Sequence, residues 1–344
     1  MNDFEQRAAE LLDAGAHGYL AGGAGDELTL RDNVAAWSRI AMAPRVLVDV
    51  EHRDTSVTLL GRERAHPFLV APMAYQLHAH AEGEIGTARA AAATRTTMVL
   101  SSQTTTDPRE VAAAMGDRDR WFQLYVYRDR QLSLDLVAAA REGGYEALVI
   151  TVDFPFGGRR DRDRSSGFAL THAPFVDGLT GPLTFAERHD MHDPTLTWDD
   201  LAAFGEASGL PVVLKGILHP ADAVRAVDAG VAGIIVSNHG GRQLDTVLAG
   251  ADALPPIVEA VDGRIDVLVD GGIRRGWDAA KALALGADAV LVGRPVLWGL
   301  ACEGAAGAQQ VLQELIDELD NTLGLLGCPR ARDLDRSYVA VRGV

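Results

Sequence analysis

The chain has 344 residues, of which 47% are hydrophobic and 23% charged, the usual composition of a soluble globular protein. Its formal net charge of −16 at pH 7 argues against non-specific binding to nucleic acid or to an anionic membrane, because both need a basic surface. A chain of this length forms either about two domains or a single α/β barrel.

The N-terminal residues 1–15 are polar with a helical pattern, and they lack the basic and apolar regions of a secretory signal. No run in the sequence approaches the roughly 18 apolar residues of a membrane helix. The two cysteines, Cys302 and Cys328, form no C-x-x-C motif, so neither a metal site nor a disulfide framework is indicated. We therefore expect a cytoplasmic protein with reduced thiols.

Eight short apolar runs bounded by turn residues are predicted to be strands. In chain order they span residues 68–73, 97–102, 121–126, 147–153, 211–217, 233–239, 266–272 and 289–295. Helical patterns lie between them, most clearly at 221–229 and 277–285, and a glycine follows each of these two closely as a stop signal. Apolar strands that alternate with helices predict a parallel sheet covered on both faces.

Eight such units predict an α/β fold of the (β/α)8 TIM barrel type, with a doubly wound open sheet as the alternative. We expect one domain, in which residues 1–67 form an N-terminal helical cap, 68–300 the barrel core and 301–344 C-terminal helices. The longest interruption, residues 157–200, follows the fourth strand and is rich in Arg, Asp, Gly, His and Pro. A loop of this length is usually a functional lid or a disordered segment.

Most of the predicted strands end in residues that can do chemistry. A single Ser or Asp in such a place is more often a helix cap, and a single His more often structural. Together they indicate a site, because the active site of an α/β barrel lies at the C-terminal ends of its strands. These residues are Pro72, Met73, Ala74, Ser101, Gln123, Tyr125, Thr151, Asp153, Lys215, Ser237, His239, Asp270, Gly271, Gly272, Gly293 and Arg294.

The segment SNHGGRQLD, residues 237–245, is the most specific motif. Its two glycines allow a tight turn and a close approach of substrate, and they place His239 and Arg242 on one short loop. A histidine can take up a proton near neutral pH, and an arginine can hold a carboxylate through two hydrogen bonds. A base beside a carboxylate clamp is what the oxidation of a 2-hydroxy acid requires.

Two glycine-rich segments follow the last two predicted strands, VDGGIRRG at residues 269–276 and LVGRP at residues 291–295. Backbone N–H groups in such turns bind phosphate, and Arg274 and Arg294 would add positive charge. The pattern differs from a dinucleotide GxGxxG motif after a first strand, which disfavours NAD. By themselves these turns indicate only a phosphorylated ligand, such as many barrels bind.

The two motifs above, with FQLYVYRDR at residues 122–130 and YLAGGAGDELTLRDN at residues 19–33, resemble the FMN-dependent 2-hydroxy acid oxidase and dehydrogenase family. The similarity runs from about Tyr19 to the final helix. It implies an FMN-dependent enzyme that oxidises an (S)-2-hydroxy acid to the 2-oxo acid. Reoxidation by O2 would give H2O2, and the resemblance suggests a homo-oligomer, a tetramer or an octamer.

The resemblance also implies roles for individual residues. His239 would be the base with Asp153 as its partner, while Tyr125 would hydrogen-bond the substrate oxygen. Tyr19, Arg160 and Arg242 would lie on the side of the substrate carboxylate, and Lys215 beside the N1–O2 edge of the flavin. The remaining residues would bind FMN: Pro72, Met73, Ala74, Ser101, Gln123, Thr151, Ser237, Asp270, Gly271, Gly272, Arg274, Gly293 and Arg294.

The chain departs from the glycolate-type oxidases of this family at two positions. Gln103 stands where they carry a tryptophan, and Met73 where many members carry a threonine. Loss of the tryptophan leaves room for a larger side group, so we expect an aryl substrate of the mandelate or 4-hydroxymandelate type, with lactate or a medium-chain aliphatic acid as the alternative. Ala74, typical of the oxidases, and the polar 157–200 segment, unlike a membrane anchor, favour a soluble oxidase.

Several alternatives stay open from the sequence alone. The same half-reaction could pass its electrons to a quinone or a carrier protein instead of O2, and the transfer could be concerted or pass through a carbanion. A phosphosugar isomerase would not need His239, Lys215 and Tyr125 together. A barrel that had lost catalysis would be expected to lose His239 or Lys215, and both are present.

Overall fold

The computed structural model describes residues 2–181 and 185–341. Eight parallel strands close into a barrel in the order β10-β11-β4-β5-β6-β7-β8-β9, which confirms the predicted TIM barrel. Their bounds are β4 Phe68–Val70, β5 Thr97–Ser101, β6 Arg120–Leu124, β7 Leu148–Thr151, β8 Val212–Ile217, β9 Gly233–Val236, β10 Asp266–Val269 and β11 Ala289–Val292.

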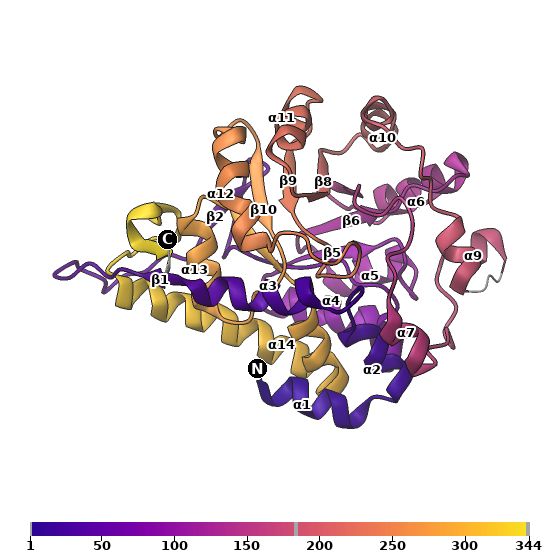
Figure 1. Cartoon of the computed structure of the whole chain (residues 1–344), viewed down its shortest axis with the longest axis horizontal. Coiled ribbons are helices and arrows are strands. Elements are labelled where there is room, and N and C mark those ends of the chain that lie inside the picture. The colour runs from indigo at the N-terminus through magenta and orange to yellow at the C-terminus, as the bar shows by residue number, and fades with distance from the viewer. Residues whose placement is uncertain (1, 182–184, 342–344) are drawn as a thin grey trace.

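Helices follow the barrel strands and cover the outside of the barrel (Figure 1). Their bounds are α4 Gly83–Ala93, α5 Pro108–Met115, α6 Arg130–Glu142, α10 Leu201–Ser208, α11 Pro220–Asp228, α12 Gly250–Val261, α13 Gly276–Ala284 and α14 Arg294–Leu326. α11 and α13 are the helices predicted at 221–229 and 277–285, each displaced by one residue. Among the helices of the described residues, none is both long and apolar enough to cross a membrane.

The chain before the barrel contains helices α1 (Asn2–Leu11), α2 (Ala14–Ala21) and α3 (Leu28–Arg39). The short strands β2 (Val57–Leu59) and β3 (Arg62–Arg64) then form a hairpin. The apolar run at 45–50 forms no strand and is solvent-exposed at Val46 and Leu47. Strand β1 (Ile40–Met42) pairs antiparallel with β12 (Val339–Val341), so the C-terminal end of the described chain returns to the segment that follows α3. Position 300 falls inside α14, shortly before a non-helical kink at Glu303 and Gly304.

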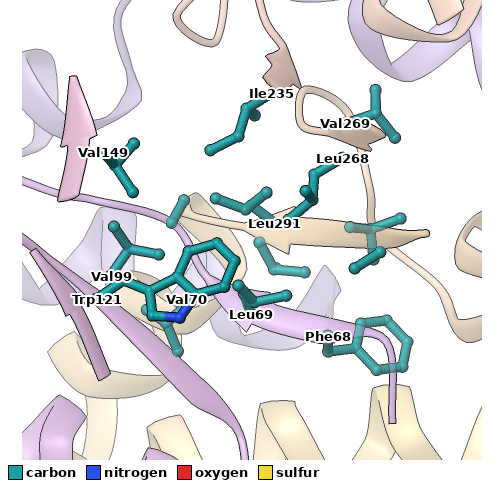
Figure 2. Packing of buried hydrophobic residues seen from close by; sticks show 14 of the residues in the cluster. Phe68, Leu69, Val70, Val99, Trp121, Val149, Ile235, Leu268, Val269 and Leu291 are labelled. Carbon is teal, nitrogen blue, oxygen red and sulfur yellow. The ribbon is translucent and has the colours of Figure 1, made fainter. Parts of the chain in front are cut away.

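Apolar side chains from the barrel strands interlock in its interior (Figure 2). Trp121 of β6 is fully buried, and its indole ring lies among aliphatic side chains of neighbouring strands. Because both faces of these strands are covered, nearly every strand residue is apolar, and this continuous pattern made the strands predictable. The labelled members are Phe68, Leu69, Val70, Val99, Trp121, Val149, Ile235, Leu268, Val269 and Leu291.

Most strands end earlier than predicted, because the residues at their C-terminal ends leave the sheet. β9 stops at Val236, although the prediction extended the strand to residue 239. His239 has a φ of 59°, in the left-handed region, and Gly240 and Gly241 follow with φ of 64° and 74°. A strand cannot continue through such residues. Several of the chemically important side chains, such as those of Asp153, His239 and Arg242, therefore lie on turns just above the barrel rim.

The 157–200 segment is partly ordered into short helices, apart from 182–184, which lie outside the described residues. These are α7 (Asp161–Ser166), α8 (Asp177–Thr180) and α9 (Phe185–Asp190). α7 packs against α2 (Figure 1). The ring of Phe168 stacks on that of Tyr19 with centroids 4.3 Å apart. The segment thus covers the C-terminal mouth of the barrel, the position expected of a lid.

Candidate active site

A single cavity at the C-terminal ends of the barrel strands collects most of the predicted site residues. It is also lined by Gln103, the position at which an enlarged substrate pocket was expected. The predicted residues on its wall are Tyr19, Pro72, Met73, Ala74, Tyr125, Thr151, Arg160, Lys215, His239, Arg242, Asp270, Gly271, Gly272, Arg274, Gly293 and Arg294.

His239 is held between two polar partners at the centre of this cavity. Its Nδ1 lies 3.0 Å from Asp153 Oδ1, and its Nε2 lies 3.1 Å from the hydroxyl of Tyr125. An ionised Asp153 accepts the Nδ1–H, which leaves the Nε2 lone pair to face Tyr125 and the cavity. The backbone N–H of His239 donates to Ser237 Oγ at 3.0 Å, which fixes the turn that carries the ring.

The environment keeps the imidazole neutral and the tyrosine protonated. Burial lowers the pKa of His239, and the positive charges of Lys215 and Arg160 lower it further, outweighing the opposite effect of Asp153. Asp153 does raise the pKa of His239, as a carboxylate beside an imidazole should, but the net shift is downward. Burial would raise the pKa of Asp153, but pairing with His239 and the charge of Lys215 outweigh it, so the pKa lies below its usual range and this carboxyl is ionised. Burial raises the pKa of Tyr125, so its hydroxyl keeps its proton.

Two arginines lie beside His239, of which Arg160 is buried and Arg242 is partly buried. Arg242 donates through Nη1 to the backbone oxygens of Tyr19 (2.7 Å) and Gly22 (2.8 Å), and its guanidinium sits 4.8 Å from the centroid of the Tyr19 ring. Arg160 donates through Nε to the backbone oxygen of Arg242 at 3.1 Å. Burial and the charge of Arg242 lower the pKa of Arg160. Two cations this close in a buried place favour an anion between them.

Lys215 leaves the middle of β8 and is buried, and its ammonium has two polar neighbours. It donates to Ser237 Oγ at 2.9 Å and lies 3.4 Å from Asp270 Oδ2. Among the described residues, the other oxygen of Asp270, Oδ1, is buried without a hydrogen-bond partner. A buried carboxylate oxygen in this state can accept a hydrogen bond from a hydroxyl group of a bound ligand.

The glycine-rich turn after β10 forms a narrow cradle. Gly271 and Gly272 have φ of 94° and 80°, and a Cβ on Gly272 would lie 1.8 Å from the backbone oxygen of Asn33. Arg274 and Arg294 line the same end of the cavity, and burial, followed by the charges of Arg242 and Arg274, lowers the pKa of Arg294 to about 9. Open backbone and clustered guanidinium groups suit a phosphate.

Three predicted cofactor residues do not line the cavity but support its floor. Ser101 donates to Gln123 Oε1 at 3.0 Å, and Gln123 Nε2 donates to Thr151 Oγ1 at 2.9 Å, so one chain of hydrogen bonds links the ends of β5, β6 and β7. Ser237 is likewise used by Lys215 and by the backbone of His239. Oδ1 of Asp270, which has no hydrogen-bond partner among the described residues, thus fits a ribityl hydroxyl of FMN. The glycine-rich turn at Gly271 and Gly272, with Arg274 and Arg294, fits the phosphate of FMN.

Sequence reasoning missed three ring-bearing residues in the wall of the cavity, Tyr75, Phe154 and His192. Phe154 directly follows Asp153 at the end of a predicted strand, so its position gave a usable signal. His192 lies in the long 157–200 segment, where no periodicity places a side chain. The rings of Phe154 and His192 pack together, with centroids 4.8 Å apart.

Comparison with known proteins agrees with this geometry. The family profile described as FMN-dependent dehydrogenase matches residues 8–341. An L-lactate oxidase of Nostoc sp. is 47% identical over 98% of this chain and 96% of its own length. The human 2-hydroxyacid oxidase 1 is 42% identical over 98% of this chain and 95% of its own length.

Solved structures show the same similarity. The crystal structure of a mandelate oxidase with (S)-4-hydroxymandelic acid superposes with a TM-score of 0.93 at 44% identity, covering 100% of this chain and 99% of that one. The family resemblance and the FMN cofactor expected from the sequence are therefore confirmed. This chain belongs to the family of FMN-dependent dehydrogenases.

Proposed function

We propose that this protein oxidises an (S)-2-hydroxy acid with an aryl side group to the 2-oxo acid, and that O2 accepts the electrons and forms H2O2. The observation that carries the proposal is the placement of a neutral, partly buried His239 between Asp153 and Tyr125, beside the buried Arg160 and the partly buried Arg242. Bound FMN would supply the acceptor for the hydride from substrate C2. The protein residues bind, orient and deprotonate the substrate.

Arg242 and Arg160 are proposed to hold the substrate carboxylate, with the hydroxyl of Tyr19 beside them. Backbone oxygens fix Arg242 at Nη1, so its guanidinium is oriented before substrate binds. An oriented fork loses little conformational entropy when it forms two hydrogen bonds to a carboxylate. This clamp places the hydroxyl of the substrate toward His239.

His239 Nε2 is proposed to accept the proton of the substrate hydroxyl. The lowered pKa keeps this nitrogen free at neutral pH, and Asp153 stabilises the imidazolium after transfer. The protonated hydroxyl of Tyr125, 3.1 Å from Nε2, is in reach of the same substrate oxygen and can donate a hydrogen bond to it. Lys215 and Asp270 would hold the cofactor, with the ammonium compensating negative charge.

The part of the cavity wall around Gln103 supports an aryl side group. Gln103 is buried, with Oε1 accepting from the hydroxyl of Tyr75 (2.8 Å) and Nε2 donating to that of Tyr127 (2.7 Å). These two hydrogen bonds hold the amide of Gln103 against the wall, and Tyr75 and Phe154 also line the cavity. Aromatic walls favour a flat apolar ring over the bare C2 of glycolate.

The proposal is tested by a screen that couples peroxide release to a dye. The substrates are glycolate, lactate, 2-hydroxyoctanoate, mandelate and 4-hydroxymandelate, both enantiomers of each chiral acid. We expect the highest kcat/KM with (S)-mandelate or (S)-4-hydroxymandelate. A preference for lactate would favour the aliphatic alternative, as the name of the Nostoc relative suggests. Flavin reduction without peroxide would identify an acceptor other than O2.

A further inference from the structure

A carboxylate lies behind the two arginines that line the catalytic cavity. Asp163 belongs to the short helix α7, and its Oδ2 lies 3.6 Å from Arg160 Nη1. The side chains of Arg160 and Asp163 are 7% and 9% exposed, so salt and water screen this pair little. Asp163 does not line the cavity, whereas Arg160 and Arg242 do. It therefore acts on a ligand in the cavity through the arginines and not by contact.

The second oxygen of this carboxylate faces the backbone that holds Arg242. A Cβ on Gly22 would lie 3.4 Å from Asp163 Oδ1, and the backbone oxygen of Gly22 accepts a hydrogen bond from Arg242 Nη1 at 2.8 Å. Among the described residues, Asp163 Oδ1 is buried without a hydrogen-bond partner. Burial raises the pKa of Asp163, and the positive charges of Arg242 and Arg160 oppose this rise. The two arginines are therefore the main electrostatic partners of Asp163.

The charge balance at this end of the cavity depends on Asp163. Arg160 and Arg242 carry two positive charges, and the carboxylate of Asp163 offsets one of them. In the same cavity, the ammonium of Lys215 has a counter-charge of its own, since it lies 3.4 Å from Asp270 Oδ2. One net positive charge of the arginine pair is thus left for a ligand. It matches the single carboxylate of a 2-hydroxy monoacid, because charges removed from water are costly unless they are balanced.

We propose that Asp163 determines the charge of the acids that the enzyme accepts, by leaving the arginine pair with one net positive charge, so that acids with one carboxylate bind and acids with two are rejected. The proposal rests on the proposed function, in which Arg160 and Arg242 hold the substrate carboxylate. A second carboxylate would lose its hydration on entering the cavity and would make the ligand and the arginine pair net negative. A malate-like 2-hydroxy dicarboxylic acid is therefore excluded by charge as well as by the shape of the wall.

The test compares two acids that differ by one carboxylate, phenylacetate and phenylmalonate. Neither has a hydroxyl group to be oxidised, so their binding to the oxidised holoenzyme is titrated near neutral pH through the change in flavin absorbance. Asp163→Asn removes the charge and keeps the shape of the side chain. Asp161→Asn is the matched control, because Asp161 lies on the same helix but is exposed and pairs with the exposed Arg159.

We expect the wild type and Asp161→Asn to bind phenylmalonate much more weakly than phenylacetate. In Asp163→Asn the affinity for phenylmalonate should rise roughly tenfold more than that for phenylacetate, because the dianion gains twice from the loss of one nearby negative charge. A loosened α7 would instead weaken both ligands. An unchanged ratio of the two dissociation constants, or equal weakening of both ligands, would overturn the proposal.

Failure of the proposed function would show separately. If the wild type did not bind phenylacetate, the aryl assignment would be wrong, and acetate and malonate would replace the two probes with the same expected change in ratio. If the wild type did not bind acetate either, the arginine pair would not be a carboxylate site, and the proposal for Asp163 would fall with it.

Discussion

Asp153 Oδ1 lies 3.0 Å from His239 Nδ1, yet the pKa of His239 is lowered, because burial and two nearby cations outweigh this carboxylate. A base that is neutral at rest is ready to accept a proton, and the carboxylate behind it acts mainly after the transfer. This balance leads to a testable pH dependence.

Flavin reduction should lose rate on the acid side with a midpoint below pH 6.5, the ordinary pKa of histidine. Asp153→Asn removes the group that raises the pKa of His239, so the midpoint should move to still lower pH. It should also slow reduction roughly 10²–10⁴-fold, because the imidazolium loses its counterion. The measurement is anaerobic stopped-flow from about pH 5 to about pH 9. A midpoint that rises in Asp153→Asn would contradict the account.

Arg242→Lys keeps the positive charge but loses the planar fork that backbone oxygens orient. We expect weaker substrate binding and slower reduction together, roughly 10²-fold in kcat/KM, since a misplaced C2 affects both. Arg159→Lys is the control, because Arg159 is exposed and does not line the cavity. If the methyl ester of the best substrate reacted as fast as the free acid, the clamp would be the wrong assignment.

Gln103→Trp should lower kcat/KM for mandelate far more than for glycolate, because the indole fills the wall where the aryl ring is proposed to lie. The change also removes the hydrogen bonds to Tyr75 and Tyr127, at a stability cost of about 1–3 kcal/mol for the buried hydroxyl of Tyr75, while Tyr127 keeps Ser102 as a partner. Gln103→Met separates the two effects, since it removes the hydrogen bonds without adding bulk. Equal losses on both substrates in Gln103→Trp would remove the argument for an aryl substrate.

Asp288 predicts a pH effect on stability at the opposite end of the barrel. Burial, with Asp266 nearby, raises its pKa from 3.8 to about 6, although it accepts a hydrogen bond from the N–H of Val267. A raised pKa in the folded state means that stability present below pH 3.8 is lost as pH rises toward 6. The loss is on the order of 2–3 kcal/mol.

Asp288→Asn keeps an acceptor for Val267 and carries no charge. Its Tm should exceed that of the wild type at pH 7.5 and match it near pH 4. The exposed Asp228→Asn serves as the control and should show no gain that depends on pH. A Tm for Asp288→Asn below that of the wild type at pH 7.5 would show that the charged form of Asp288 stabilises the fold.

The barrel was predictable because its strands are buried on both faces and read as continuous apolar runs, such as Leu148–Thr151 in β7. The ends of the strands were not predictable, because an apolar pattern does not show where the backbone turns. Strand β9 ends at Val236, and three residues later the backbone of His239 is left-handed, with φ of 59°. The apolar runs nevertheless predicted which rim of the barrel carries the site.

The site was predictable where its residues belong to a strand or directly follow one. Lys215 lies within β8, and Asp270 directly follows β10. Tyr75 and His192 were missed because loop aromatics carry no repeating pattern, and their place in the cavity depends on long-range packing. The direction of the net pKa shift of His239 could not be predicted from the sequence for a similar reason, since it depends on burial and on cations from distant segments. The homo-oligomer and the cytoplasmic location stay predictions.

The most direct test of the central claim is anaerobic stopped-flow reduction of the flavin by (S)-mandelate in the wild type and in His239→Ala. We predict full bleaching of the flavin in the wild type. In His239→Ala, which should keep its flavin because the phosphate cradle is untouched, reduction should be slower by at least roughly 10²–10⁴-fold. Reduction of His239→Ala at a rate near that of the wild type would contradict the role of His239 as the base.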